Sequence, residues 1–381
     1  MEWKLNLDEY LQELSYLVSF DSGSRIPEGT AKVAEYFTEK FNKLGWNVEY
    51  HYIDDAIGPC LEITNNSKDS YDILFIGHMD TVFPRGMAQK HLLHIEGNKL
   101  HALGANDMKA SILSAYYALK ALQENNLLEN INICLLLNSD EELSSIYSRP
   151  LIEQIAKKTK YALILEPARK GGEMVKQRRG VARYKLEGHG IASHSGVNPW
   201  DGSSAINELA HWILELHAKN NLAKNTSVNV GLISGGTGVN VVSPTASAEV
   251  DVRFSDMEEV KSIEKLMREL EANPRTKGGA YIKATGGVTR PPMNPTTETL
   301  TLCDAITEIS KKINVEFKWI ATGGGSDASF TAACGVPTLD GFGPVGGDAH
   351  TTGEYLLIDT IKPRWVLLLE TVKYIIEHKI K

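Results

Sequence analysis

The segment Ile73–Asp80, ILFIGHMD, decides the fold class of this 381-residue chain. It opens with a short continuous apolar run, Ile73–Gly77, which is typical of a strand buried on both faces. Two similar runs follow at Ile131–Leu137 and Tyr161–Leu165, and a helical pattern over Met108–Asn125 separates the first run from the second. This alternation predicts an α/β domain, a mostly parallel sheet with helices on both faces.

The patterning changes after this domain, and the chain is too long for one ordinary core. Within residues 179–290, the segment Ala246–Phe254 alternates between apolar and charged residues, as a strand with one wet face does. Helical patterns flank it. We therefore expect a smaller α+β domain at 179–290, inserted into a larger domain formed by 1–178 and 291–381. The turn-rich segment Gly286–Pro295 marks the return of the chain to the larger domain.

Composition excludes several classes of function. The chain is 42% hydrophobic and 23% charged, with a formal net charge of -8, which argues against non-specific binding of nucleic acid. No apolar stretch approaches the about 20 residues that span a membrane. The N-terminal segment lacks a signal-peptide pattern, and the four cysteines are scattered. We expect a cytoplasmic protein without a membrane or nucleic-acid partner.

Histidines and acids stand where the predicted strands end or helices begin. Because the carboxyl ends of parallel strands meet at one edge of a sheet, we expect these side chains to converge. A buried cluster of this kind is costly without a cation, whereas one or two divalent metals would make it a hydrolytic centre. The candidates are His78, Asp80, Asp107, Glu141, Glu142 and Glu166, with His350 in a glycine-rich segment near the C-terminus.

Each of these residues has a simpler explanation when it is taken alone. Asp107 fits the N-cap of a helix, and His350 fits an exposed loop. The acids that follow Leu137 fit a solvated turn, although they leave a buried strand directly. Two adjacent acids can also take different roles, in which one binds metal and the other accepts a proton from water. The residue types do not decide which of Glu141 and Glu142 does which.

Taken together, these strings resemble one enzyme family over nearly the whole chain. It is the family of zinc-dependent hydrolases that includes glutamate carboxypeptidase, acetylornithine deacetylase, succinyl-diaminopimelate desuccinylase and aminoacylase, with the glutamate carboxypeptidase branch nearest. The resemblance rests on the order and spacing of GHMDTV, GANDMK, SDEE, LEP, GIASHSG, GVNVVSP, VDVRF, GGGSDASF and GGDAHTTGEY.

The resemblance implies two zinc ions in each subunit. One would be held by His78, Asp107 and Glu166. The other would be held by Asp107, Glu142 and His350, so that Asp107 bridges the two. Cobalt and manganese also accept these ligands, and a mononuclear or manganese-dependent enzyme is an alternative.

The resemblance also assigns roles around the metals. Glu141 would be the general base that activates a metal-bridging water for attack on an amide carbonyl. Asp80 would hold the second ring nitrogen of His78 and fix its tautomer. Family members tend to carry a cis peptide bond after the bridging aspartate, which here is the bond between Asp107 and Met108.

The 179–290 domain would then be a lid and the site of homodimerisation. His194 would reach the partner subunit's active site and stabilise the oxyanion, although a turn histidine is the simpler reading. Asn240 and Arg253 would bind the substrate carboxylate, with Arg290 assisting. Arg253 could instead pair with Asp251 on the same face of its strand.

These features predict a metal-dependent hydrolase that releases a C-terminal amino acid, with glutamate as the first expectation, from a small peptide or an acyl conjugate. A deacylase of N-acyl amino acids with the same site is the alternative. A non-catalytic dimeric binding protein is a third reading, which would require a missing ligand or base. The glycine-rich strings GGTGVN and TGGGSDAS lack the spacing of nucleotide-binding loops.

Overall fold

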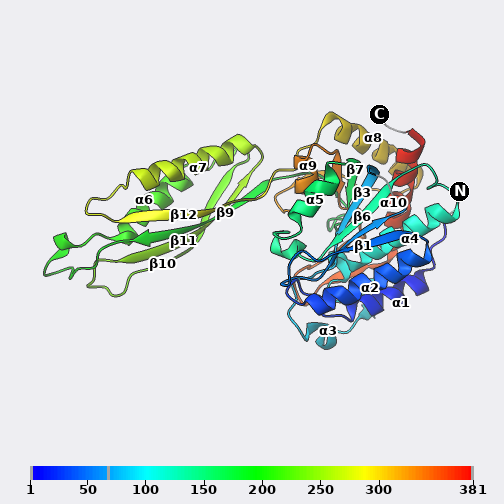
Figure 1. The fold of residues 1–381 in the computed structure, drawn as a ribbon, viewed down its shortest axis with the longest axis horizontal. Coiled ribbons are helices and arrows are strands. Elements are labelled where there is room, and N and C mark those ends of the chain that lie inside the picture. Colours follow the sequence, from blue (N-terminus) through cyan, green and yellow to red (C-terminus); the bar gives the residue numbers. More distant parts are fainter. Residues whose placement is uncertain (1–2, 67–68, 379–381) are drawn as a thin grey trace. The chain divides into compact units, whose positions relative to one another are not determined.

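The chain folds into two compact units, and the computed structural model describes residues 3–66 and 69–378 of it (Figure 1). The first unit comprises Met1–Gln177, Asn294–Thr322 and Ser326–Lys381. The second comprises Arg178–Met293 and Gly323–Gly325, a short glycine segment that carries no boundary signal in the sequence.

The first unit is built on an eight-stranded sheet with the order β1-β2-β6-β3-β7-β14-β8-β13. Its centre is parallel, because β3 pairs in parallel with β6 and β7, and β7 pairs in parallel with β14. The strands β1 and β2 run antiparallel to their neighbours, and β8 runs antiparallel to β14. The strands are β1 Asn47–His51, β2 Cys60–Thr64, β3 Tyr71–His78, β6 Ile133–Asn138, β7 Thr159–Ile164, β8 Met174–Arg178, β13 Trp319–Thr322 and β14 Thr338–Asp340.

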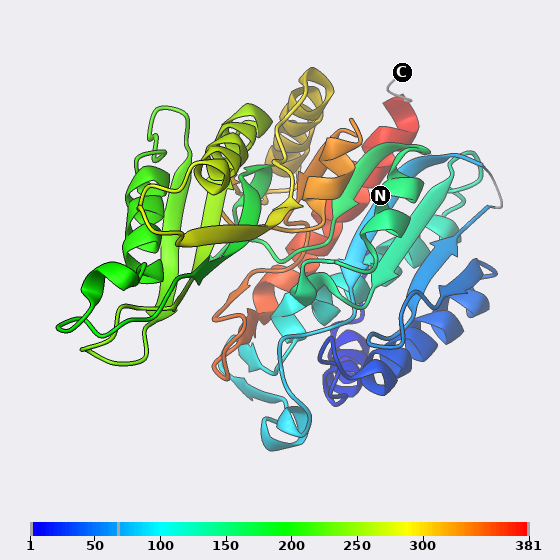
Figure 2. The same cartoon turned by 60° about the vertical axis from the view of Figure 1, so that its left-hand side comes forward.

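Side chains of the central strands are buried on both faces of this sheet. On β3, Ile73 and Phe75 join one core cluster together with apolar residues of α4 and α10. Leu74 and Ile76 are equally buried but point the other way, since successive strand residues alternate between faces. The helices α5 and α9 pack against β7 on that second side. The predicted α/β fold with helices on both faces is confirmed (Figure 2).

Eight α-helices belong to the described part of this unit. The helix expected over Met108–Asn125 begins later, at Ala110, because the irregular turn Ala105–Lys109 precedes it and Asp107 and Met108 have non-helical dihedral angles. No helix in the described ranges is both long enough and apolar enough to cross a membrane. The helices are α1 Leu7–Val18, α2 Pro27–Lys43, α3 Met87–Lys90, α4 Ala110–Glu124, α5 Arg149–Ala156, α8 Thr297–Lys312, α9 Ala328–Ala333 and α10 Ile358–His378.

A small second sheet of this unit carries the loop that holds His350. Its order is β15-β16-β5-β4, and its pairs are antiparallel. The loop between β15 and β16 therefore starts and ends in paired backbone. The strands are β4 His94–Glu96, β5 Lys99–His101, β15 Gly346–Gly347 and β16 Tyr355–Leu357.

The second unit is a four-stranded antiparallel sheet with two α-helices on one face. The strand order is β10-β11-β9-β12. Val250 and Val252 of β11 point into a core shared with α6 and α7, while the intervening Asp251 stays partly exposed on the other face. The elements are β9 Gly180–His189, β10 Ser227–Gly235, β11 Thr245–Phe254, β12 Tyr281–Arg290, α6 Ala205–His217 and α7 Met257–Ala272.

Candidate metal centre

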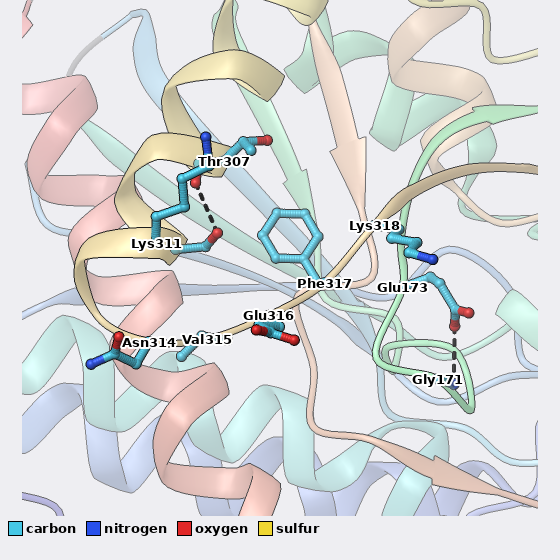
Figure 3. A pocket seen from close by; sticks show the side chains of 10 residues that line it. Gly171, Glu173, Thr307, Lys311, Asn314, Val315, Glu316, Phe317 and Lys318 are labelled. Carbon is cyan, nitrogen blue, oxygen red and sulfur yellow. Dashed lines mark hydrogen bonds between the residues drawn. The ribbon is translucent and has the colours of Figure 1, made fainter.

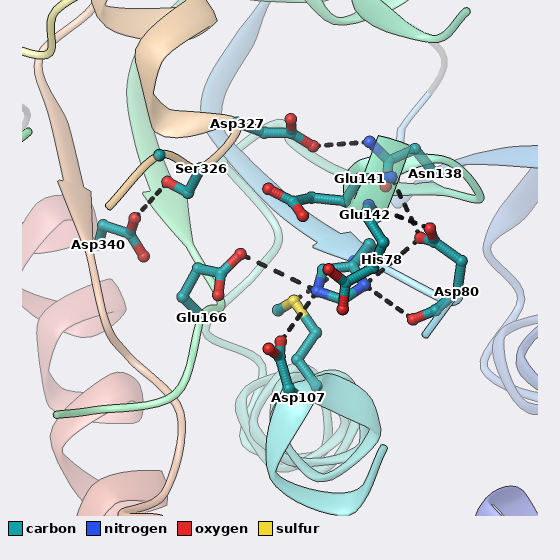
Figure 4. A network of polar contacts seen from close by, with 12 residues as sticks. His78, Asp80, Asp107, Asn138, Glu141, Glu142, Glu166, Ser326, Asp327 and Asp340 are labelled. Carbon is teal, nitrogen blue, oxygen red and sulfur yellow. Dashed lines mark hydrogen bonds and ion pairs between the residues drawn. The ribbon is translucent and has the colours of Figure 1, made fainter. Parts of the chain in front are cut away.

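Four candidate residues converge at one edge of the large sheet, where three neighbouring parallel strands end (Figure 4). His78 is the last residue of β3. Glu141 and Glu142 begin the short 3-10 turn that follows β6, and Glu166 comes two residues after β7. Ligand atoms of His78, Glu141 and Glu166 lie within 4.8 Å of one another.

Asp107 and His350 complete the cluster from two other parts of the chain. Asp107 lies in the turn before α4, where the peptide bond between Asp107 and Met108 is cis, as the family resemblance implies. Asp107 Oδ1 lies 3.1 Å from His78 Nε2, and Asp107 Oδ2 lies 3.2 Å from His350 Nε2. His350 Nε2 also lies 3.3 Å from Glu142 Oε2. The two oxygens of one carboxylate thus face two different histidines.

Asp80 supports this cluster from behind and is completely buried. The carbonyl oxygen of Asp80 accepts a hydrogen bond from His78 Nδ1 at 2.9 Å, while its carboxylate Oδ1 lies 3.4 Å from the same nitrogen. The carboxylate accepts the backbone N–H groups of Glu141 and Glu142 and the hydroxyl of Ser24. The closer contact to the His78 ring is therefore the main chain of Asp80, and its carboxylate mainly holds the acidic turn.

The electrostatics of the centre favour positive charge. Burial, together with repulsion from Asp107 and Glu141, raises the pKa of Glu166 well above its usual range. Burial acts to lower the pKa of His78, but its contacts with Asp107 and Asp80 outweigh burial and raise that pKa well above its usual value. Without a cation, protons must neutralise a group of acids that lie this close together.

The same histidine and carboxylate atoms fit divalent cations. Contacts with Asp107 and Glu142 raise the pKa of His350 to about 10, so this histidine takes up a proton to pair with the acids. A metal ion could replace that proton, because imidazole nitrogen and carboxylate oxygen are the ligand types that zinc prefers. The ligand atoms of His78, Asp107 and Glu142 also lie within 4.8 Å of one another.

Two other features of the first unit lie apart from these residues. Glu49, His51 and Glu62 of β1 and β2 also come close together, but Glu62 is already paired with His51 and accepts a hydrogen bond from Tyr71. A cavity of about 680 Å³ opens beside the end of α8 and contains none of the candidate residues (Figure 3).

His194 and Asn240 lie together in the second unit. A β-bridge joins His194 to Val241, and the carbonyl of Asn240 accepts the backbone N–H of Ser195 at 3.0 Å. Both candidate side chains are exposed. His194 Nδ1 accepts the backbone N–H groups of Gly196 and Val197, each at 3.1 Å. Since Nδ1 is an acceptor, the neutral ring carries its proton on Nε2, which points a donor away from the turn.

Arg253 and Arg290 occupy the opposite end of the same sheet. Both pair with Val181 of β9, one on β11 and the other on β12. The His194 turn lies beyond the other end of β9, at His189. Val181 and His189 are eight positions apart along β9, which corresponds to about 26 Å. Within one copy of this unit, His194 and Asn240 therefore lie too far from Arg253 and Arg290 for all four to contact one small molecule.

The guanidinium of Arg253 is engaged by its own strand. Nε and Nη2 donate to the two carboxylate oxygens of Asp251 at 2.7 and 3.0 Å, and Nη1 donates to the carbonyl of Gly323. This is the alternative pairing that the sequence left open. Arg290 is only 4% exposed and packs against Gly325.

Comparison with known proteins supplies the family. The model of peptidase family M20/M25/M40 matches residues 74–374. The chain belongs to this family. Carboxypeptidase G2 of Pseudomonas sp. (strain RS-16) is 28% identical over 361 residues, which cover 93% of this chain and 86% of the relative. Succinyl-diaminopimelate desuccinylase of Pelagibacter ubique is 28% identical over 94% of this chain and 96% of the relative.

Solved structures agree with this M20 assignment. Aminopeptidase PepT from Bacillus cereus has a TM-score of 0.80 and 25% identity, covering 97% of this chain and 98% of that one. A metallo-carboxypeptidase of the M20 family from Sulfolobus solfataricus, at 19% identity, shares the fold with a TM-score of 0.73, covering 96% and 99%. The predicted family and enzyme class are confirmed: the chain is a metal-dependent hydrolase of the peptidase and amidohydrolase type.

Two side chains near the centre of this M20 enzyme were missed at the sequence level. Ser24 donates to the Asp80 carboxylate at 2.6 Å, although it lies in an early loop with no motif. Glu354 accepts three backbone N–H groups of the turn that carries Asp107. The only signal for Glu354 was its place in the string GGDAHTTGEY, four residues after His350.

Proposed function

We propose that this chain is a two-zinc exopeptidase that releases a C-terminal amino acid, with glutamate as the first candidate, from a peptide or an acyl conjugate. One observation carries the proposal: the two carboxylate oxygens of Asp107 face His78 at 3.1 Å and His350 at 3.2 Å. A carboxylate placed in this way suits a bridge between two ions. Similarity to carboxypeptidase G2 supports the substrate class.

In this proposal each ion has its own set of ligands. His78, Asp107 and Glu166 would hold one ion, and Asp107, Glu142 and His350 would hold the other. When bound, the ions would polarise the amide carbonyl and lower the pKa of a water molecule toward about 7.

Glu141 would move the proton in the reaction. Its carboxylate would accept a proton as the water oxygen attacks the carbonyl carbon, and would deliver that proton to the leaving nitrogen as the C–N bond breaks. Two observations support the role: Glu141 stands beside the candidate ligand Glu142, and the Asp80 carboxylate accepts the backbone N–H groups of both residues.

His194 would stabilise the oxyanion that forms during the attack. The two backbone N–H groups at its Nδ1 favour the tautomer that donates from Nε2, which is the donor such a role requires. The separation of about 26 Å between the two ends of β9 supports a contribution from a second subunit. We therefore propose a homodimer formed through the second unit, in which His194 serves the partner's site.

Exposed apolar residues on the second unit support this dimer. The edge strand β10 carries Leu232 and Ile233, each 63% exposed, and Val239 follows in the next loop with its side chain fully exposed. An edge strand with exposed apolar side chains is a surface that another chain commonly covers.

The substrate carboxylate would be bound by Arg253 and Arg290, with Asn240 contributed from the second subunit together with His194. Arg253 and Arg290 stand on either side of Val181, a spacing that suits two donors to one carboxylate. Asp251 holds the Arg253 guanidinium, so binding of the substrate carboxylate would exchange one carboxylate for another.

A deacylase of N-acyl amino acids is the second candidate. The similarity to a succinyl-diaminopimelate desuccinylase, which spans 94% of this chain, favours it. Both functions use one site and differ only in which side of the amide bond is recognised. A panel of acyl-glutamates and dipeptides, assayed beside N-acetylornithine and N-succinyl-diaminopimelate, separates the two. A higher kcat/KM for the last two substrates would replace the proposed exopeptidase by the deacylase.

The metal requirement has its own test. Protein purified without chelator should contain two zinc ions per chain by mass spectrometry. Chelation should abolish hydrolysis, and zinc add-back should restore it. A protein that hydrolyses the panel equally well after complete removal of metal would refute the proposed mechanism.

A further inference from the structure

Glu354 is a buried carboxylate beside the metal centre that is not one of the candidate ligands. Its side chain is 1% exposed. Oε2 accepts the backbone N–H of Gly104 at 2.8 Å, and Oε1 accepts those of Asn106 and Asp107 at 2.8 and 3.0 Å. One side chain therefore binds three main-chain donors of a single turn that lies 247 to 250 residues earlier in the chain.

The bound turn cannot satisfy these donors by itself. Gly104 has a φ of +71°, and Asp107 and Met108 depart from helical dihedral angles. Backbone N–H groups at such an irregular helix start have no carbonyl partner within the helix, and leaving them buried without one would cost free energy. Glu354 supplies the acceptor, and in doing so it fixes the main chain of the proposed bridging residue.

A buried lysine of the same turn interacts with Glu354. Lys109 belongs to the same turn, is 1% exposed and interacts electrostatically with Glu354. Its Nζ donates to the carbonyl of Phe20 at 3.3 Å, which keeps the ammonium group in place. Burial raises the pKa of Glu354 to about 7, and the hydrogen bonds from backbone N–H groups act to lower it, so these donors offset part of the cost of burying the carboxylate.

The same residue anchors the loop that carries His350. Glu354 follows His350 by four residues, and its backbone N–H donates to the carbonyl of Thr351 at 3.2 Å. Thr351 in turn donates its N–H to Asp348. Since His350 lies within this hydrogen-bonded turn, a carboxylate fixed at Glu354 also limits where the His350 ring can lie relative to Asp107.

We propose that Glu354 is a positioning residue of the metal centre, which holds Asp107 and His350 at the spacing of metal ligands before any ion binds. The proposal rests on the proposed function, because it needs these two residues to be ligands. Outer partners that orient ligands in this way typically change metal affinity by about 10–100-fold when they are replaced.

The first experiment measures zinc affinity by competition with a chromophoric chelator. Glu354→Gln replaces one acceptor oxygen by an amide NH2 group, which is itself a donor and cannot accept a hydrogen bond from the backbone N–H that it faces. We therefore expect zinc to bind about 10–100-fold more weakly. A matched control is Glu208→Gln in the second unit. Glu208 is completely buried and accepts the backbone N–H groups of Arg275 and Thr276 at 2.9 and 2.7 Å.

The control separates positioning from a merely structural role. Both variants should lower the Tm of the metal-free protein, but only Glu354→Gln should weaken zinc binding. Equal zinc affinity in Glu354→Gln and wild type would overturn the role of Glu354, as would an equal loss in Glu208→Gln. A wild-type protein that binds no zinc would overturn the proposed function, and this inference with it.

A second measurement uses the wild-type protein and does not depend on a variant that folds. Hydrogen exchange of the metal-free protein should show slow exchange at the backbone amides of Asn106 and Asp107, and adding zinc should change these rates little. Amides that exchange freely without zinc and become protected only with it would show that the turn is not held in advance, and would overturn the inference.

Discussion

The carboxylate of Asp80 accepts the backbone N–H of Glu141 at 3.2 Å. The same carboxylate accepts the N–H of Glu142 at 3.1 Å, and the carbonyl of Asp80 accepts His78 Nδ1–H at 2.9 Å. One buried residue thus connects the histidine at the end of β3 with the two acids after β6. The relative position of a candidate ligand and the candidate base depends on it.

Replacing Asp80 should therefore disturb both. We expect Asp80→Ala to lower zinc affinity or kcat/KM by about 10–100-fold, because the acidic turn loses its anchor and the His78 ring keeps only its bond to the main-chain carbonyl. The measurements are zinc binding and steady-state kinetics. Ser24→Ala is the control, since it removes only one hydrogen bond to this carboxylate and should stay within a few-fold of wild type. An Asp80→Ala protein with wild-type affinity and kinetics would contradict the prediction.

Glu141→Gln tests the proton transfer. The variant keeps the size of the side chain but removes its basicity, so we expect kcat to fall by about 10²–10⁴-fold while the zinc content stays at the wild-type value. The measurements are kcat on the preferred substrate and metal content by mass spectrometry. Full turnover from Glu141→Gln would exclude the role, and loss of zinc from the variant would instead identify Glu141 as a ligand.

His194→Ala tests the oxyanion donor. Removing one such donor typically lowers kcat by about 10²–10³-fold, and we expect a loss in that range. Near-normal turnover would leave His194 as a turn histidine with no part in the reaction.

The proposed contribution across subunits has a separate test. Mixing His194→Ala subunits with Glu141→Gln subunits creates heterodimers. If His194 acts in the partner's site, one site of each heterodimer regains both an intact Glu141 and an intact His194, and activity returns on mixing. If it acts in its own subunit, no site is intact, and the mixture stays as inactive as the separate variants.

Much of the fold could be predicted from the sequence because buried parallel strands leave a strong signal. The runs at Ile73–Gly77 and Ile131–Leu137 are continuous and apolar, and each leads directly into polar residues that the structure brings to one edge of the sheet. The candidate ligands come together for the same geometric reason, although their roles remain predictions.

Other features left no such signal. The turn at Ala105–Lys109 overlaps the start of Met108–Asn125, where apolar periodicity predicted a helix, because periodicity reports burial and not hydrogen bonding. Glu354 was not identified because its partners are main-chain N–H groups, which every residue type except proline carries. The pairing of Arg253 with Asp251 was only one of two possibilities. Residues i and i+2 lie on the same face of a strand, and a substrate carboxylate could approach Arg253 on that face as well.

Arg253→Ala tests recognition of the substrate carboxylate. We expect kcat/KM for a dipeptide with a free C-terminus to fall tenfold or more, because a charge-assisted contact is lost. The same variant should leave the slow hydrolysis of the C-terminal amide unchanged, since that substrate has no carboxylate to bind. Asp251→Ala is the matched variant: it releases the guanidinium and should preserve or lower KM for the acid. Equal losses on acid and amide would assign Arg253 a structural role.

The pair of His51 and Glu62 predicts a pH dependence of stability that is independent of the metal centre. The hydrogen bond to Glu62, partly opposed by burial, raises the pKa of His51, and the same contact lowers the pKa of Glu62. Stabilisation by protonated His51 is complete below its unfolded pKa of about 6.5 and is lost as pH rises through the folded pKa. Stabilisation by ionised Glu62 is present above about pH 4.3 and is lost as pH falls through its lowered pKa.

The pair of His51 and Glu62 should therefore contribute most to the free energy of unfolding between about pH 4.3 and pH 6.5. Both side chains are partly exposed, so we expect His51→Gln to lower the free energy of unfolding by only about 0.2–1 kcal/mol at about pH 5.5, and by less at about pH 8.5. Urea unfolding at the two pH values measures the difference. Glu62→Gln should cause a loss with the same pH trend, because it removes the other half of the pair. A loss of the same size at both pH values would mean that packing, and not charge, connects the two residues.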